Sequence, residues 1–367
     1  MDSNKLSDTL LTQRKGLALS VEALAASASL SAGRLTELEA GASATTSEVV
    51  RLARALAVDA AALWRGDVPA SRTTARFRAP TGVLSLASED ALLLSRAAEV
   101  GRVGGHLASL LGRADSPVVV ARQVLAVESW PEPWEQGYKL GAGARARLAP
   151  ERAPIGSIAA LFESLLVHVA TVDLVTDDLH AVSLYEAGAL PIILLNASAK
   201  QCKSPLSRRA ILAHELCHLL HDGGSTDLLT LISRGADTTP HEQRANGFAP
   251  SFIVPGGWLA PHTTDARELV TEIAATWGLS LEGAAWHAKN AGHITNAVAE
   301  ALVKDLAKQS VAFPDGGFEK PPPASRAHAD LPPPHPVVRG LVSRLVAEAV
   351  DADALSVPRA REILLLR

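Results

Sequence analysis

The chain has 367 residues, of which 47% are hydrophobic and 20% charged, so it is long enough for two or more domains and too apolar to be a disordered polyelectrolyte. Its formal net charge of −4 excludes nucleic-acid binding through a bulk positive charge. Two cysteines make no disulfide framework. The sequence shows no apolar leader and no run of about 18 apolar residues, so we expect a cytoplasmic protein without a membrane span.

The first domain, residues 1–67, is predicted to be all-α, with five short helices over 11–67. Ser20 and Ser31 occupy N-cap positions, and Gly41 ends the third helix. The pieces L-A, L-x-x-L-E-x-G and L-A-R-A-L follow one another in this order. Residues 11–67 thereby resemble a Cro/repressor-type (XRE) helix-turn-helix domain.

That resemblance implies a recognition helix at 31–39, with Ser31, Arg34 and Thr36 as the candidate DNA-binding residues. Residues 1–70 hold seven basic and eight acidic side chains, a net charge of −1, whereas DNA-binding domains carry a basic footprint. We therefore expect weak DNA binding through residues 1–67 at best. A protein with the same fold is the alternative partner, and the sequence leaves the oligomeric state open, a dimer included.

Residues 68–150 are predicted to combine a basic linker at 71–79 with helices at 86–111 and 133–148. The domain that follows, 151–313, is predicted to begin with a helix near 155–166. Three β-rich runs come after it, at 166–174, 179–187 and 190–196. Two further helices are expected in 269–294, broken at Gly278. The pattern predicts an α+β domain with a small three-stranded sheet.

The stretch AILAHELCHLLHD, residues 210–222, is the strongest chemical signal in the chain. His214 and His218 are four residues apart, so on a helix they lie one turn apart on the same face. Two imidazole nitrogens so placed can bind one metal ion at about 2.0–2.1 Å each. Glu215 follows the first histidine, as in H-E-x-x-H zinc hydrolases, where this glutamate is the general base. An amphipathic core helix with polar residues by chance is the alternative.

A third ligand is needed, and the residues alone leave several candidates: His221, Asp222, Asp227, His241 and Glu242. Pro240 is expected to begin a helix on which Glu242, Asn246 and Ala249 share one face. This placement favours Glu242 over His241.

The two segments RRAILAHELCHLLH and EQRANGFAPSFIVP together resemble the ImmA/IrrE family of zinc metallopeptidases, over about 151–300. The resemblance implies a zincin-like α+β fold, His214, His218 and Glu242 as Zn²⁺ ligands, and Glu215 as the catalytic base. Cys217 departs from the glycine usual in the family. His287 and His293, farther along, are candidate transition-state stabilisers, with an ordinary surface histidine as the alternative.

Residues 314–336 hold eight prolines and predict an extended linker. Residues 337–367 predict two helices around 351–355 whose apolar faces dock either on the core or on a partner. The expected protein is therefore a zinc endopeptidase with a helix-turn-helix domain and a C-terminal helical segment.

By resemblance, its substrate is a repressor-type protein, cut in a bacterial stress response or in mobile-element control. The alternatives are a non-catalytic helix-turn-helix regulator, or a toxin–antitoxin or defence component that uses the zinc domain for sensing or binding.

Overall fold

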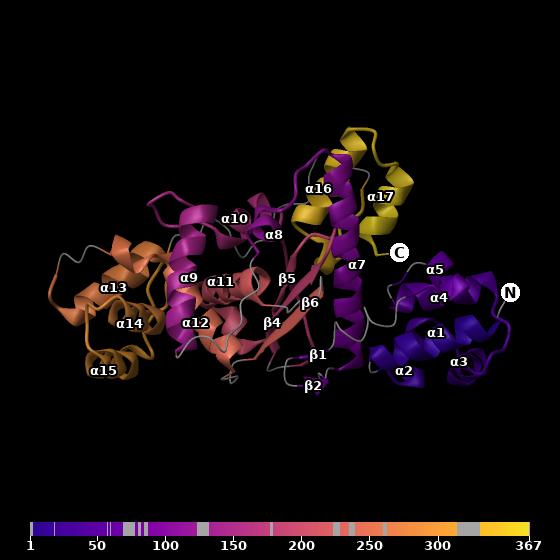
Figure 1. Cartoon of the computed structure of the whole chain (residues 1–367), viewed down its shortest axis with the longest axis horizontal. Coiled ribbons are helices and arrows are strands. Elements are labelled where there is room, and N and C mark those ends of the chain that lie inside the picture. Colours follow the sequence, from indigo (N-terminus) through magenta and orange to yellow (C-terminus); the bar gives the residue numbers. More distant parts are fainter. Residues whose placement is uncertain are drawn as a thin grey trace.

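Helices surround one small mixed sheet in this protein, seen in a computed structural model (Figure 1). The structure describes the following residues: 3–17, 19–56, 58, 60–68, 78–79, 82–83, 87–122, 132–176, 179–222, 228–234, 239–259, 263–313 and 331–366. Most of the two predicted linkers, namely 71–77 and 314–330, lies outside the described residues. Among the described residues, no helix combines the length and the apolarity needed to cross a bilayer.

The N-terminal region contains the five predicted helices: α1 (Ser3–Gly16), α2 (Val21–Ser27), α3 (Ala32–Glu39), α4 (Thr46–Leu56) and α5 (Ala60–Arg65). Two starts are fixed by the expected caps, because Ser20 Oγ accepts from the Ala23 amide and Ser31 Oγ from the Arg34 amide. A buried leucine-rich core holds the helices together. The helices agree with the expected pattern, and the helix-turn-helix type stays a prediction.

The sheet has four strands: β3 (His168–Val172), β4 (Leu179–Glu186), β5 (Ile192–Asn196) and β6 (Leu228–Arg234). Their order is β3-β5-β4-β6, with β3 parallel to β5 and the other pairs antiparallel. The three strands predicted from the sequence, β3, β4 and β5, are all present, and β6 adds a fourth that was not predicted. β6 becomes a strand by pairing along β4, more than forty residues earlier, and that pairing leaves no local signature.

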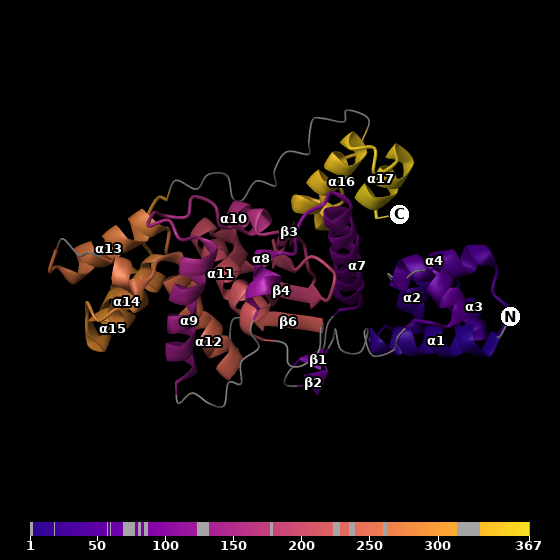
Figure 2. The ribbon, with the colours of Figure 1, turned by 45° about the horizontal axis from the view of Figure 1, so that its top comes forward.

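Apolar layers cover both faces of the sheet (Figure 2). One face packs on α11 (Pro205–His221) and α10 (Ile158–Ser164), and α12 (Pro240–Ile253) and α9 (Pro133–Leu148) lie beyond α11. The other face packs on α7 (Ser88–Leu110) and α16 (Leu341–Asp351). The sheet thus forms the floor under the H-E-x-x-H helix.

Three helices pack together beside α12: α13 (Ala266–Trp277), α14 (Leu281–Asn290) and α15 (Asn296–Leu306). Gly278 separates the first two in the left-handed conformation (φ 74°), which is the predicted break. The sequence analysis predicted no helix at α15 or at the short α8 (Pro117–Ala121), and it missed the hairpin of β1 (Arg78–Ala79) with β2 (Gly82–Val83).

The C-terminal helices α16 and α17 (Val357–Leu364) fold back on the core. Before them, the 3₁₀ turn η4 (Pro336–Val338) lies against β3, where His168 Nε2 donates to the Val337 carbonyl over 2.7 Å. On the α7 side of the sheet, Ser95 Oγ of α7 donates a hydrogen bond of 2.9 Å to the Leu56 carbonyl of α4. Of the two docking options left open by the sequence, the structure shows the one on the core.

Candidate metal centre

The helix α11 carries the H-E-x-x-H motif across the sheet. Ser204 caps it through the Ser207 amide, and Pro205 occupies its first turn, where no intrahelical amide donor is needed. Within the helix, Glu215 and His218 are fully buried, whereas His214 lies at the edge of the cleft. The apolar residues between them pack on the sheet, so the helix cannot rotate without exposing its core face.

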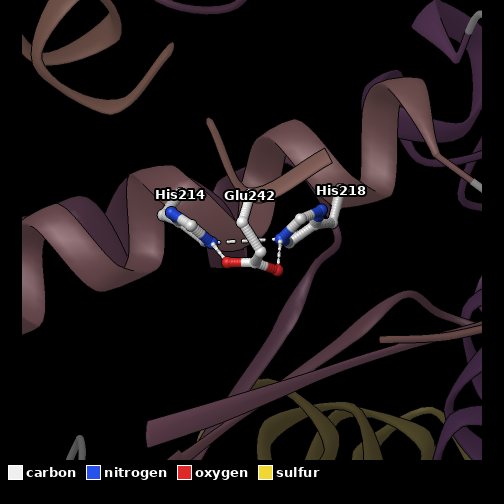
Figure 3. Close-up of side chains that lie close together, drawn as sticks. All are labelled: His214, His218 and Glu242. Carbon is white, nitrogen blue, oxygen red and sulfur yellow. Dashed lines mark hydrogen bonds and ion pairs between the residues drawn. The ribbon is translucent and has the colours of Figure 1, made fainter. Parts of the chain in front are cut away.

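The helix α12 brings Glu242 to the two histidines. It begins as predicted at Pro240, with Thr239 Oγ1 accepting from the Glu242 amide. Glu242 Oε2 lies 3.0 Å from His214 Nε2, and Oε1 lies 3.2 Å from His218 Nε2 (Figure 3). The two Nε2 atoms are 3.0 Å apart. Three donor atoms from two helices thus converge on one point.

Glycines let α12 approach α9 closely enough for this placement. A Cβ atom added at Gly137 would lie 1.8 Å from the Arg244 carbonyl oxygen, and one at Gly247 would lie 2.1 Å from the Trp134 carbonyl oxygen. Any larger side chain at either position would force the two backbones apart. The glycines therefore set how far α12, and with it Glu242, stands from the rest of the domain.

Hydrogen bonds on the far side of each imidazole fix its orientation. His218 Nδ1 lies 2.7 Å from Asp222 Oδ2, and a carboxylate oxygen only accepts, so Nδ1 donates and a neutral His218 keeps its lone pair on Nε2. His214 Nδ1 lies 3.1 Å from Asn246 Oδ1. Both rings therefore turn Nε2 toward Glu242, in the arrangement that outer hydrogen bonds impose on metal-binding histidines.

Asp222 ties the two ligand helices together. Besides His218, its carboxylate contacts His241 Nδ1 at 2.7 Å and the buried guanidinium of Arg244 on α12. Arg244 also donates to Gln136 Oε1 at 3.3 Å. The position of His218 therefore depends on a buried charge pair that joins α11 to α12.

Electrostatics and geometry both fit a cation between the three donors. Burial alone would raise the pKa of Glu242, but without a metal, hydrogen bonds and positive charge from His214 and His218 in their protonated form outweigh it and lower that pKa. Two nitrogen lone pairs and a carboxylate repel one another unless a proton or a metal ion lies between them. Tetrahedral zinc with bonds of about 2.0–2.1 Å separates its ligand atoms by roughly 3.3 Å, close to the spacing seen here.

Glu215 lies beside the three donor residues, and its two carboxylate oxygens differ in hydrogen bonding. Its Oε2 accepts a 2.6 Å hydrogen bond from Ser183 Oγ on β4. Its Oε1 is buried without a hydrogen-bond partner among the described residues. A buried acceptor left open is costly unless a ligand or a water completes it, and this side chain lines a cleft. The sequence analysis missed Ser183, which carries no local signal.

The cleft beside the three donors has a volume of about 680 Å³. His214, Glu215 and Glu242 line it together with His180 of β4, and its remaining walls come mainly from α11, α12 and α14, with Trp134 from α9. Two other third-ligand candidates are not among the converging donors: His221 packs edge to face against Phe248, and Asp227 is outside the described residues. Cys217 is fully buried, and burial raises the pKa of its thiol to about 12, so it is an inert packing residue.

Neither of the two candidate transition-state stabilisers, His287 and His293, lines this cleft, so the structure adds no support to that role. His287 is fully buried, its Nδ1 lies 3.1 Å from Tyr138 Oη, and burial lowers its pKa to about 4. His293 is exposed after the end of α14. Sequence distance from the motif gave no sign of this, because packing decides which face of α14 reaches the cleft.

On α3, the three candidate DNA-binding side chains all make contacts within the N-terminal region. Ser31 caps the helix, and Thr36 Oγ1 donates to the Ala32 carbonyl. Arg34 pairs with Glu48 at 2.8 Å and Glu37 at 3.0 Å, and hydrogen bonds to these carboxylates raise its pKa.

Comparison with known proteins supports the identity of the metal domain only. Residues 163–287 match the Peptidase_M78 family model, described as the IrrE N-terminal-like domain. The matched segment contains all three donors and Glu215, so the chain holds an IrrE-like metallopeptidase domain with a triad of histidine, histidine and glutamate that could hold a metal ion. No curated protein and no solved structure matches the chain.

Proposed function

We propose that this protein is a zinc-dependent endopeptidase that cuts another protein at one site. The observation that carries the proposal is the convergence of His214, His218 and Glu242 beside a buried glutamate, at a cleft that His214, Glu215 and Glu242 line. Two imidazoles and one carboxylate are one of the donor sets with which catalytic zinc sites keep a fourth position open.

A zinc ion bound there would polarise the substrate carbonyl and make a water molecule more acidic. The chain's own residues supply the rest. Glu215 Oε1 is the open acceptor that can take a proton from the attacking water and later pass it to the leaving amine. Ser183 holds the other oxygen, so the carboxylate cannot turn away. Asp222 and Asn246 keep the Nε2 atoms of both imidazoles turned toward Glu242, where they would hold the ion.

We further propose a repressor-type protein as the substrate, and a protein rather than DNA as the partner of the N-terminal region. Arg34 supports the second part, because its guanidinium already pairs with two carboxylates, and releasing it to a phosphate or a base edge would leave both unpaired. The net charge of −1 over residues 1–70 points the same way.

Cleavage tests the proposal directly. The full chain is co-expressed with repressor-type proteins encoded beside its gene, as wild type or as Glu215→Gln. The wild type is expected to produce a defined fragment. Glu215→Gln should keep its zinc but lose about 10²–10⁴-fold in rate, because an amide cannot accept the water proton.

A pull-down with Glu215→Gln should then recover the uncut substrate. Equal cutting by both proteins would refute the role of Glu215. A wild type that captures a partner without ever cutting it would instead support the non-catalytic alternatives.

For the N-terminal region, DNA affinity of the full chain is measured at two salt concentrations, with Arg34→Ala as the comparison. We expect weak binding that Arg34→Ala does not reduce. Tight, sequence-selective binding at physiological salt would favour a DNA-binding regulator.

A further inference from the structure

An irregularity in β4 bears directly on the cleft. Leu179 pairs with Arg234 of β6, and Ala181 pairs with the preceding residue, Ser233. Two steps along β4 thus match one step along β6, so His180 is the extra residue of a β-bulge. Bulges next to functional sites redirect a side chain that regular alternation would send to the other face.

The packing on both sides of β4 shows that this happens here. Leu179 and Val182 both belong to the core on the α7 face of the sheet. Ala181 belongs to the core on the α11 face, where Ser183 also bonds Glu215. Strict alternation would place His180 with Val182, but His180 lines the cleft together with residues of α11. The bulge therefore puts two consecutive residues, His180 and Ala181, on the metal side.

The backbone of His180 is also anchored to the segment that leads into α11. Its carbonyl oxygen accepts from Cys202 Sγ at 3.4 Å, and Cys202 lies on the 3₁₀ turn η2 (Lys200–Lys203) just before that helix. The residue is 9% exposed, so the protein holds its side chain while leaving a small part open to the cleft.

We propose that His180 is a substrate-binding residue of the proposed peptidase, on whose function this inference rests: its imidazole donates a hydrogen bond to the oxygen of the carbonyl group at which the substrate is cut. Glu215 and Glu242, which line the same cleft, only accept when ionised, so as carboxylates they cannot donate to an oxygen that gains negative charge. A histidine placed among them can, and a donor of this kind typically accounts for about 10²–10³-fold in rate.

The test uses the full chain loaded with cobalt(II), whose visible spectrum reports ligands at the metal without any turnover. The probe is methylphosphonate, a small tetrahedral anion that imitates the charged oxygens of the reacting carbonyl. Spectral titration compares the wild type with His180→Ala, His180→Gln and the matched control His293→Ala, which removes an exposed histidine outside the cleft. Azide serves as a second ligand that binds metal but offers no tetrahedral oxygens.

We expect His180→Ala to bind methylphosphonate on the order of 10- to 100-fold more weakly, as for the loss of a hydrogen bond to a charged group, with unchanged cobalt content and azide affinity. His180→Gln keeps an N–H donor and should recover part of the loss, and His293→Ala should stay within about twofold of the wild type.

Wild-type affinity in His180→Ala would overturn the proposal, as would loss of cobalt or of folding in both His180 variants, since either marks a structural role. A wild type that binds cobalt but not methylphosphonate would also overturn it. Binding that depends on His180 in a protein that cuts no substrate would support the His180 contact and refute the peptidase function, so the two failures are distinguishable.

Discussion

Replacing Asp222 by asparagine should weaken zinc binding although Asp222 is not one of the three donors. The carboxylate accepts from His218 Nδ1 and also contacts the buried guanidinium of Arg244. Asparagine keeps the shape but has one acceptor oxygen and no charge, so it cannot satisfy both groups. Losing such an outer hydrogen bond typically costs 10–100-fold in metal affinity, or roughly 1.4–2.7 kcal/mol.

The same substitution should also lower the stability of the metal-free protein. Arg244 is fully buried, and its other contacts include Gln136 Oε1 at 3.3 Å and His241 Nδ1 at 3.2 Å, neither of which supplies a carboxylate charge. Leaving one member of a buried charge pair without its partner costs about 3–5 kcal/mol. Two measurements separate the effects: zinc affinity by competition with a chromophoric chelator, and urea unfolding after zinc has been removed.

His241→Gln is the matched control, because His241 contacts the other oxygen of the same carboxylate and is one-third exposed. We expect its zinc affinity to stay within about threefold of the wild type. Zinc affinity within twofold of the wild type in Asp222→Asn would refute the claim that Asp222 orients His218. A large loss in His241→Gln would revive His241 as a ligand in place of Glu242.

Three further outcomes follow from the structure. His214→Ala and Glu242→Ala should each bring bound zinc, measured by elemental analysis, from about one per chain to near zero; full zinc in either would refute the ligand assignment. Gly137→Ala should destabilise the protein by about 1–3 kcal/mol in urea unfolding, because its Cβ would meet the α12 backbone, whereas Gly143→Ala on the same helix meets nothing within 4 Å and should be neutral or slightly stabilising. Burial lowers the pKa of His168 to about 4, from about 6.5 in the unfolded chain. Neutral His168 therefore makes its full contribution to the free energy of unfolding above pH 6.5. As the pH falls to about 4, a stability on the order of 3 kcal/mol is lost. His168→Gln should reduce this loss in unfolding measured at pH 7.5 and 4.5, and an unchanged pH dependence would contradict the assignment.

Much of the local structure could be predicted from sequence because its causes are local. The H-E-x-x-H spacing places two histidines on one face of any helix, and Ser204 and Pro205 start that helix. Pro240 and the helical spacing after it also favoured Glu242 over His241. Each of these inferences depends on residues a few positions apart, and the structure brings the three donors together accordingly.

The surroundings of the donors were decided by tertiary structure. Ser183 reaches Glu215 across 32 residues of sequence, and His180 faces the cleft because pairing with β6 produces a bulge. His287 does not line the cleft for the same kind of reason, since the packing of α14 buries it. Which side chains meet across two elements depends on register, on bulges and on how closely backbones approach, and no periodicity within one segment encodes these.

The N-terminal region illustrates the same division. Helix spacing and serine caps predicted its five helices from sequence, and the structure contains them. The state of Arg34 was decided by the tertiary fold, because the fold brings Glu48 from the following helix within 2.8 Å of its guanidinium. Composition showed that this region lacks a basic surplus. Only the packed helices show that the arginine expected to read DNA is already paired, because an ion pair between two helices forms only once those helices are in place.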